Sequence, residues 1–233
     1  MPMGRVMNNI FEENLGDCWI SSVRHVMQNG SNHFDEDVEI KELLGLSIRI
    51  TEPDSKDPFI HHVGDQSVIS NMLKKFSKGV RMPNRQFTYG ELLFELNGVD
   101  QVDWLVERIR AKKETKSASI CLMRPGDCNP QLPCLTTLDL KLRQEKLHLQ
   151  FFFRSQNVFG RQYANLLALA DLQEKISEKL QVTPGCMSGY IASAHIYAYD
   201  FNAAISLSER SLDKADDLFY TEGPRSIRMH FDH

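Results

Sequence analysis

The segment from residue 132 to 155 places the strongest constraint on the fold of this chain. It reads LPCLTTLDLKLRQEKLHLQFFFRS and holds two runs of alternating apolar and polar residues, joined by a short polar turn at 143–146. Alternation with a period of two puts successive side chains on opposite faces of a strand. Two such runs joined by a short turn indicate a β-hairpin, so the sequence predicts an antiparallel pair of strands here.

The rest of the chain mixes helical and strand-like patterns. Apolar residues recur with helical spacing in four segments: 9–30, which stops at Gly30, 66–78, 101–114 and 164–180. Strand-like patterns cover 42–50, 117–123 and 189–200. Loops are expected at 35–39 and 53–64, a turn at Pro184-Gly185, and a helical or frayed segment at 206–217. Because helices and strands alternate irregularly, we predict an α+β fold with helices packed on one large mixed or antiparallel sheet.

Size and charge narrow the class of protein. The chain has 233 residues, 42% of them hydrophobic, so we expect a single domain over 1–233. A net charge of -4 argues against nucleic-acid or anionic-membrane binding. No apolar run reaches the roughly 20 residues of a membrane helix, and the first residues lack the apolar stretch of a signal peptide. We therefore expect a cytoplasmic protein.

The cysteines and histidines do not suggest a metal centre or a disulfide framework. No CxxC pair occurs among the five cysteines, which are Cys18, Cys121, Cys128, Cys134 and Cys186. The adjacent His61 and His62 would point to opposite sides of an extended loop, so we expect no metal there.

Cys134 is the cysteine with a second interpretation. It begins the first strand of the predicted hairpin, and Arg154 ends the second strand, so pairing would make the two neighbours. A nearby guanidinium favours the thiolate, which is the form of cysteine that acts as a nucleophile. The alternative from the pattern alone is a buried cysteine beside a surface salt bridge.

A longer set of motifs bears on this choice. Along 132–200 the chain carries Pro-Cys, a hairpin, Arg-Ser, an Asn that opens a long helix, and His-x-Tyr on a strand, namely Cys134, Arg154, Ser155, Asn165, His195 and Tyr197. This order resembles the catalytic half of the thymidylate synthase family, especially its short archaeal-type members. Upstream, Tyr89-Gly90 and Asp100-Gln101-Val102 are similar to two further motifs of that family.

The resemblance implies a role for each matching residue. Cys134 would attack C6 of a pyrimidine and turn C5 into a carbon nucleophile, and Tyr89 would help to remove the C5 proton through water. Asn165 would pair with the O4/N3 edge of the base, which favours uracil. Arg154 and Ser155 would bind the nucleotide phosphate.

The resemblance also implies partners. His195 and Tyr197 would hydrogen-bond the sugar of a pyrimidine nucleoside monophosphate. The one-carbon donor would be 5,10-methylenetetrahydrofolate, and the protein would be a homodimer.

Three positions differ from the family pattern. Lys116 and Ser117 stand where the family has an Arg pair that reaches the partner's phosphate, and Lys lacks the bidentate fork of Arg. Asn157 replaces an Asp that contacts the pterin ring of folate. The helix at 66–78, QSVISNMLKKFSK, contains no acidic residue where the family has a catalytic Glu, and Glu91 and Glu95 follow the Tyr-Gly motif.

The sequence therefore predicts an enzyme that adds a one-carbon unit to C5 of a pyrimidine nucleotide, with methylation of dUMP to dTMP as the first interpretation. Hydroxymethylation at C5 is an alternative. A nucleotide-binding paralogue with little turnover is a second, and an unrelated α+β binding domain is a third.

Overall fold

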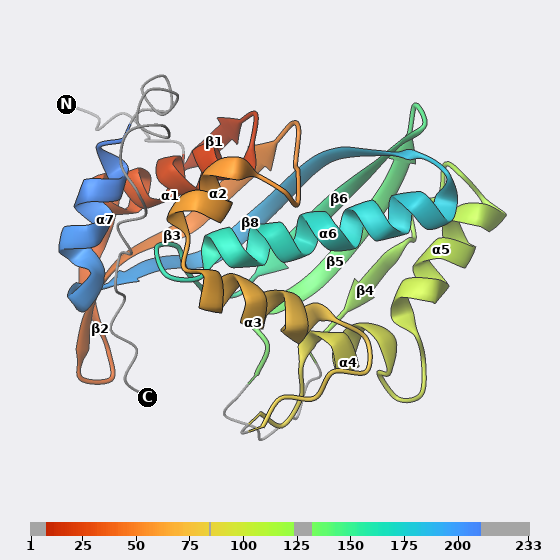
Figure 1. The fold of residues 1–233 in the computed structure, drawn as a ribbon, viewed down its shortest axis with the longest axis horizontal. Helices are drawn as coiled ribbons and strands as arrows, with labels where there is room; N and C mark the ends of the chain where they lie inside the picture. The colour runs from red at the N-terminus through yellow and green to blue at the C-terminus, as the bar shows by residue number, and fades with distance from the viewer. Residues whose placement is uncertain (1–7, 84, 124–131, 211–233) are drawn as a thin grey trace.

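The computed structural model describes residues 8–83, 85–123 and 132–210. Its strands form one mixed sheet in the order β1-β3-β8-β6-β5-β4, with β2 paired to β3 and β7 paired to β8 (Figure 1). The strands are β1 (Asn9–Glu12), β2 (Ser31–Asp35), β3 (Val38–Ile50), β4 (Ser119–Cys121), β5 (Leu135–Arg143), β6 (Lys146–Phe153), β7 (Gln156–Asn157) and β8 (Thr183–Tyr197).

Helices lie on one face of this sheet, and the long helix α6 runs across its middle (Figure 1). The α-helices are α1 (Leu15–Asn29), α2 (Pro58–Val63), α3 (Gln66–Phe76), α4 (Tyr89–Phe94), α5 (Gln101–Ala111), α6 (Gln162–Leu180) and α7 (Phe201–Ser208). A 3₁₀ turn, Ala198–Asp200, joins β8 to α7. The predicted α+β fold, with helices packed on one large sheet, is therefore confirmed.

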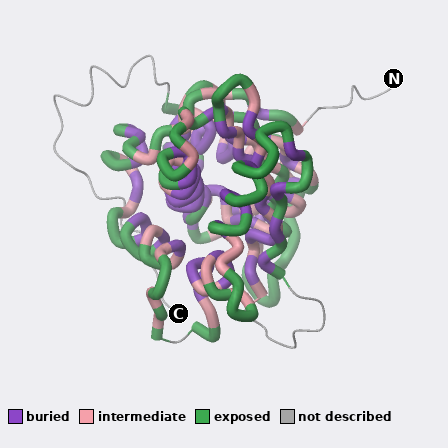
Figure 2. Tube along the Cα trace, turned by 90° about the vertical axis from the view of Figure 1, so that its right-hand side faces the viewer, coloured by how far each residue is buried: buried purple, intermediate pink, exposed green. Residues whose placement is uncertain are grey.

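The core lies between α6 and the sheet, and Figure 2 shows the buried residues concentrated in the interior. Every second side chain of β6 is buried, namely Leu147, Leu149, Phe151 and Phe153, and these belong to the same hydrophobic cluster as the buried residues of α6. Gln150 and Phe152 point the other way and are exposed.

The predicted hairpin is present as β5 and β6, paired antiparallel from Leu135↔Phe153 to Arg143↔Lys146. Its two turn residues, Gln144 and Glu145, both have positive φ, at 52° and 56°. Two positive-φ residues match the right-handed twist of the flanking strands, so the short polar turn closes the hairpin tightly.

Two predictions near the N-terminus need correction. The segment 9–30 is not one helix, because Asn9–Glu12 pair with β3 as strand β1, and the helix starts at Leu15 with Asn14 as its cap. The loop predicted at 35–39 is the tight turn of the β2–β3 hairpin, closed by Glu36 at φ 52°.

The loop predicted at 53–64 is also wrong over its second half. Helix α2 begins after Asp57, whose carboxylate accepts from the Ile60 N–H, and Pro58 stands in its first turn, where a missing N–H costs nothing. His61 and His62 are therefore in the last turn of a helix. Within 8–83, 85–123 and 132–210, no three His, Cys, Asp or Glu side chains gather in a way that could hold a metal ion.

The turn predicted at Pro184-Gly185 is instead part of a strand. Strand β8 starts at Thr183, and Pro184 pairs with Leu147 in its second position, near the strand end where a residue without an N–H is tolerated. At the other end of the chain, α7 stops at Ser208, and most of the predicted 206–217 segment lies outside the described residues.

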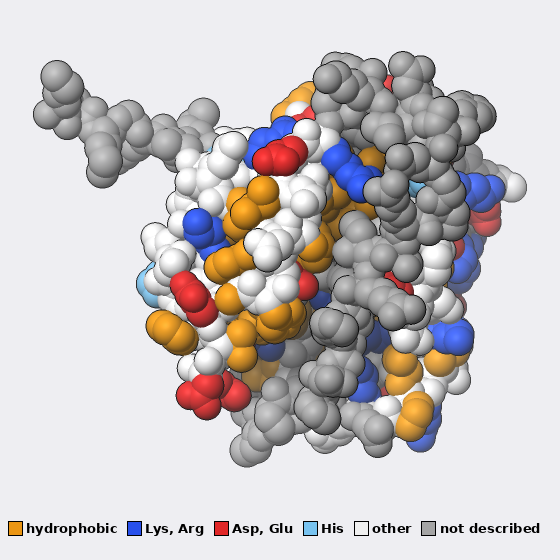
Figure 3. Space-filling view, turned by 60° about the vertical axis from the view of Figure 1, so that its left-hand side comes forward, with side chains coloured by type: hydrophobic (Ala, Val, Ile, Leu, Met, Phe, Trp, Pro, Cys, Tyr) orange, Lys and Arg blue, Asp and Glu red, His pale blue; other side chains and the backbone are white. Residues whose placement is uncertain are grey.

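On the side of the molecule that carries β2 and α7, hydrophobic side chains gather in a patch bordered by acidic and basic ones (Figure 3). The exposed hydrophobic residues of β2 and α7 are Phe34 and Ile205. None of the helices in the described ranges combines the length and the hydropathy that a membrane span requires.

Candidate active site

Cys134 directly precedes β5, at the open end of the hairpin. The backbone N–H of Arg154 donates to the Cys134 carbonyl at 2.8 Å, so the structure brings together the two residues that hairpin pairing predicts as neighbours. The thiol is free and half-buried. A half-buried thiol at a strand end is accessible to a ligand while its position is fixed by the sheet.

The side chain of Arg154 does not lie against the sulfur in the expected way. Its Nε donates to the Pro133 carbonyl at 3.1 Å and its Nη2 to the Leu132 carbonyl at 2.9 Å. The partner of the Cys134 Sγ is Ser155, whose hydroxyl donates to it at 3.6 Å. The guanidinium therefore holds the loop before Cys134, and the serine contacts the thiol.

Tyr89 is the first residue of α4, and its hydroxyl accepts from the Leu135 N–H at 3.1 Å, one residue beyond Cys134. A capping box of Thr88 and Glu91 starts this short helix and fixes the tyrosine at its end. Burial raises the pKa of the Tyr89 phenol well above its usual value. The phenol therefore stays protonated at neutral pH and can donate its proton.

Asn165 lies in the first turn of α6 rather than at its cap, which is Arg161. Its side chain is buried, and its Nδ2 donates to the Arg161 carbonyl at 3.1 Å. No partner for its Oδ1 occurs in the part of the chain that the structure describes. A buried acceptor without a partner costs stability, which is typical of a ligand-binding group.

His195 and Tyr197 end β8, with ring centroids 5.3 Å apart. Burial lowers the pKa of His195, so the imidazole is neutral at neutral pH. The Tyr197 hydroxyl donates to Asp35 at 2.7 Å, and its ring stacks on Tyr199 with centroids 5.2 Å apart. Asp35 is a site neighbour that the sequence analysis missed, because only the β2–β3 hairpin brings it to the end of β8.

Asn157 pairs with His195 across β7 and β8, and its Oδ1 accepts from the Gly160 N–H at 2.8 Å. Its side chain is also hydrogen-bonded to Asp200, whose carboxyl is buried. Burial raises the pKa of Asp200 to about 6. This carboxylate was not predicted from the sequence, because it follows the His-x-Tyr strand without a motif of its own.

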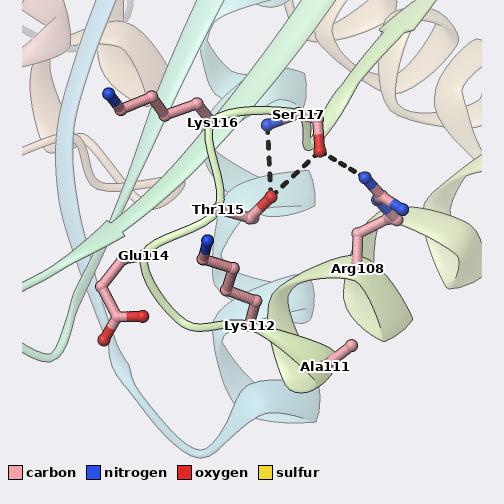
Figure 4. Close-up of a pocket in the computed structure, with 7 residues that line it drawn as sticks. All are labelled: Arg108, Ala111, Lys112, Glu114, Thr115, Lys116 and Ser117. Atoms are coloured by element: carbon pink, nitrogen blue, oxygen red, sulfur yellow. Dashed lines mark hydrogen bonds between the residues drawn. The ribbon is translucent and has the colours of Figure 1, made fainter.

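Lys116 is apart from these residues. It lines a cavity of about 480 Å³ between the end of α5 and the start of β4, where Arg108 donates to the Ser117 hydroxyl (Figure 4). The Lys116 side chain points away from that pair in Figure 4. The β4–β5 register places it beside the hairpin-turn end of β5, roughly 25 Å along the strand from Cys134.

Lys75 is a third residue of the site that was not predicted from the sequence. Its Nζ lies 4.4 Å from the centre of the Tyr89 ring. Burial, with smaller contributions from Arg85 and Arg161, lowers its pKa to about 8, while Cys134 acts in the opposite direction. The signal in the sequence is its place at the edge of the apolar stripe of α3, three residues after Met72.

The fold and these contacts define an α+β protein with a candidate thiol site where several strand and helix ends meet. Residues 74–228, more than half of the chain, match the family described as thymidylate synthase. The chain therefore belongs to the thymidylate synthase family.

Three archaeal relatives, each described as "Putative thymidylate synthase", are similar over most of their length. The protein from Methanosarcina mazei is 29% identical over 207 residues, covering 84% of this chain and 95% of the relative. That from Methanococcoides burtonii is 28% identical over 192 residues, covering 81% and 88%. That from Methanopyrus kandleri is 29% identical over 188 residues, covering 78% and 89%.

Proposed function

We propose that this protein transfers a one-carbon unit to C5 of a pyrimidine nucleoside monophosphate, methylating dUMP to dTMP with methylenetetrahydrofolate. The observation that carries the proposal is the position of Cys134. Its free thiol accepts a hydrogen bond from the Ser155 hydroxyl. The Tyr89 hydroxyl accepts one from the backbone N–H of Leu135, the residue after Cys134. Family membership supplies the reaction class.

In the proposed reaction, the Cys134 sulfur adds to C6 of the base, and the C5 carbon becomes the nucleophile. Methylenetetrahydrofolate supplies the one-carbon unit and the hydride. Tyr89, as a protonated phenol, orders a water molecule beside the base. Asn165 presents its unpaired Oδ1 to the N3–H of uracil, and this match favours uracil because the N3 of cytosine carries no hydrogen.

The phosphate and sugar have separate sets of residues in this proposal. A guanidinium has five N–H donors, and the two hydrogen bonds of Arg154 to carbonyl oxygens leave donors for a phosphate. Ser155 adds a hydroxyl beside it. A neutral His195 and Tyr197, which is oriented by Asp35, suit hydroxyl groups of the sugar.

The proposed folate site has an acidic group although Asn157 replaces the family's Asp. The Asp200 carboxyl is bonded to the Asn157 side chain and can accept hydrogen bonds from the N–H groups of a pterin ring. The residues at this point therefore fit the co-substrate, with Asn157 and Asp200 together in the role of the single Asp.

We also propose that the protein is a homodimer in which Lys116 contacts the partner's nucleotide. Lys116 lies roughly 25 Å from Cys134 in the same chain, farther than a nucleoside monophosphate extends. A contact between Lys116 and the substrate would therefore come from a second copy.

The test is release of tritium from [5-³H]dUMP in the presence of methylenetetrahydrofolate. We expect release by the wild-type protein, with loss of activity in Cys134→Ser, and unchanged activity in Cys186→Ser as the cysteine control. Absorbance at 340 nm reports dihydrofolate, so tritium release with this signal supports methylation, and release without it indicates hydroxymethylation. Nucleotide binding with no release under any folate condition would indicate a binding paralogue and contradict the proposal.

A further inference from the structure

Lys75 occupies an unusual place for a lysine. The stripe of α3 that faces the core consists of Val68, Ile69, Met72 and Phe76, and Lys75 lies at its edge, half-buried. Its Nζ lies 4.4 Å from the centre of the Tyr89 ring, and Phe76 packs against the same ring at 4.6 Å. The aromatic contact holds the amine beside Tyr89, whose hydroxyl accepts a hydrogen bond from the Leu135 N–H, one residue beyond Cys134.

Three charged groups act on this amine: Arg85 lies in the loop before α4, Cys134 precedes β5, and Arg161 caps α6. The Tyr89 ring at the start of α4 packs against the amine without a charge. The two arginines disfavour the ammonium form, as burial does, and no carboxylate of the described residues is among the charges that act on it. The surroundings therefore favour release of a proton from Lys75 compared with an exposed lysine.

The lowered pKa, about 8, has a direct consequence for proton transfer. At pH 7 roughly one Lys75 side chain in ten is the neutral amine, compared with fewer than one in a thousand for an ordinary lysine. A group whose pKa is close to the working pH is an efficient acceptor of protons. Tyr89 cannot take this role because burial raises the pKa of its phenol.

We propose that Lys75 is the base that receives the C5 proton of the nucleotide, which extends the proposed function to a residue outside the family's matching motifs. After the Cys134 sulfur has bonded to C6 and the one-carbon unit to C5, the C5–H bond breaks. Its electron pair stays on the ring as the enolate formed by C5, C4 and O4. The proton passes, directly or through the water at Tyr89, to the lone pair of Nζ, which becomes an ammonium and later returns the proton to solvent.

The same chemistry predicts a reaction that needs no folate. When the sulfur adds to C6 of dUMP in D₂O, the C5 enolate takes a deuteron from solvent on the face opposite Lys75, which leaves the original hydrogen facing Nζ. Loss of the original hydrogen to Nζ and departure of the sulfur then leave dUMP deuterated at C5. This exchange is visible by NMR as loss of the C5–H signal.

The experiment compares wild type with Lys75→Met, Lys75→Arg and the control Lys74→Met, since Lys74 is the exposed neighbour on the same helix. For each variant we would measure exchange at C5 and tritium release with methylenetetrahydrofolate. Equilibrium dialysis measures dUMP binding, and thermal melting checks that the variant is folded. We expect Lys75→Met to bind dUMP but to lose both reactions by about a hundredfold or more. Lys74→Met should match wild type.

Lys75→Arg tests whether the reaction needs a proton acceptor at this position or only a fixed positive charge. Arginine keeps the charge but stays protonated, so we expect it to be as slow as Lys75→Met. The wild-type exchange rate should rise with pH through about 8, and the Lys75 variants should lack that rise. Exchange at the wild-type rate in Lys75→Met or in Lys75→Arg would overturn the role of Lys75 alone. A wild-type protein that binds dUMP without exchange or release would overturn the proposed function as well.

Discussion

Asp200 carries a carboxyl group in the interior, at the end of the 3₁₀ turn that follows β8, and its hydrogen bond to Asn157 joins two elements of the proposed folate site. Burial disfavours the ionised form and raises the pKa to about 6, above the ordinary value of 3.8. Above pH 6 the folded protein therefore keeps a buried charge that the unfolded chain would place in water. A buried carboxylate that lowers the stability of the fold in this way is typical of a functional site.

We predict that Asp200→Asn stabilises the protein but weakens use of the folate. At pH 7.5 the variant should melt at a higher temperature than wild type, because it removes the buried charge. The difference should narrow below pH 6, as Asp200 becomes protonated in the folded state, and close only well below pH 3.8, where it is protonated in both states. The KM for methylenetetrahydrofolate should rise about tenfold or more, because a charge-assisted hydrogen bond is lost.

Asp37→Asn serves as the control for this prediction, since Asp37 is exposed in the turn of the β2–β3 hairpin. It should change neither the melting temperature nor the KM. An Asp200→Asn protein with the wild-type KM for the folate would show that the carboxylate does not contact the co-substrate.

At the scale of elements, the junction of α3 with α4 places both Tyr89 and Lys75. Gly90 lies so close to the end of α3 that a Cβ atom would be 2.0 Å from the Ser77 carbonyl oxygen. Since this neighbour is backbone, it cannot move aside without shifting the helix end. The glycine of the Tyr-Gly motif is therefore required for packing, and it sets the distance between the two helices.

We predict that Gly90→Ala destabilises the fold by about 1–3 kcal/mol, as overpacking does, and reduces tritium release by separating Tyr89 from Cys134. Chemical denaturation measures the first effect. Gly79→Ala is the comparison, because nothing lies within 4 Å of its Cβ and only its φ of 72° is strained. Gly79→Ala should lower the free energy of unfolding by about 1 kcal/mol and leave activity unchanged. Equal effects of the two variants would contradict the role of the Ser77 contact.

Elements with a strong local pattern could be predicted from the sequence, and the others depended on context. The hairpin at 132–155 was predicted well because alternation and a polar turn act locally. Strand β1 was missed because its four residues form a strand only by pairing with β3. The turn expected at Pro184 was wrong because pairing with β6 outweighs the local preference of Pro-Gly.

At the scale of the whole molecule, the site joins residues that are far apart in the chain. Hairpin pairing predicted that Cys134 and Arg154 are neighbours, and the backbone bond between them is present. Asp35, Lys75 and Asp200 could not be placed by the same reasoning. They reach the site through a hairpin, a helix face and a 3₁₀ turn, and the packing of those elements is not encoded in local spacing.

The face of the sheet that does not contact α6 carries exposed apolar side chains. Phe152 and Tyr190 are paired across β6 and β8 and stack with centroids 5.5 Å apart. Leu44 on β3 is 67% exposed. Exposed apolar side chains gathered on one sheet face favour an interface with another protein surface, which agrees with the homodimer proposed above.

A dimer in which each site takes Lys116 from the partner makes a prediction that no monomer can satisfy. Cys134→Ser lacks the nucleophile, and Lys116→Glu should weaken nucleotide binding in the neighbouring site by repelling the phosphate. Each variant alone should release little tritium from [5-³H]dUMP. In a mixed dimer, one site combines an intact Cys134 with an intact Lys116 from the other chain. Mixing the two variants after brief unfolding should therefore restore up to a quarter of wild-type activity. This is the statistical expectation, because about half of randomly paired dimers are mixed and each has one intact site of two.

Tyr190→Glu tests the interface itself, with Ile205→Glu on α7 as an equally exposed control in the helix layer. The charge at Tyr190 should convert the dimer to a monomer by light scattering and remove activity with it, whereas the control should stay dimeric and active. If mixing restores activity and Tyr190→Glu removes it, dimerisation through the open sheet face is what brings Lys116 to the partner's site. A wild-type protein that is monomeric and fully active would contradict both, because Lys116 is then too far from the Cys134 of its own chain to take part.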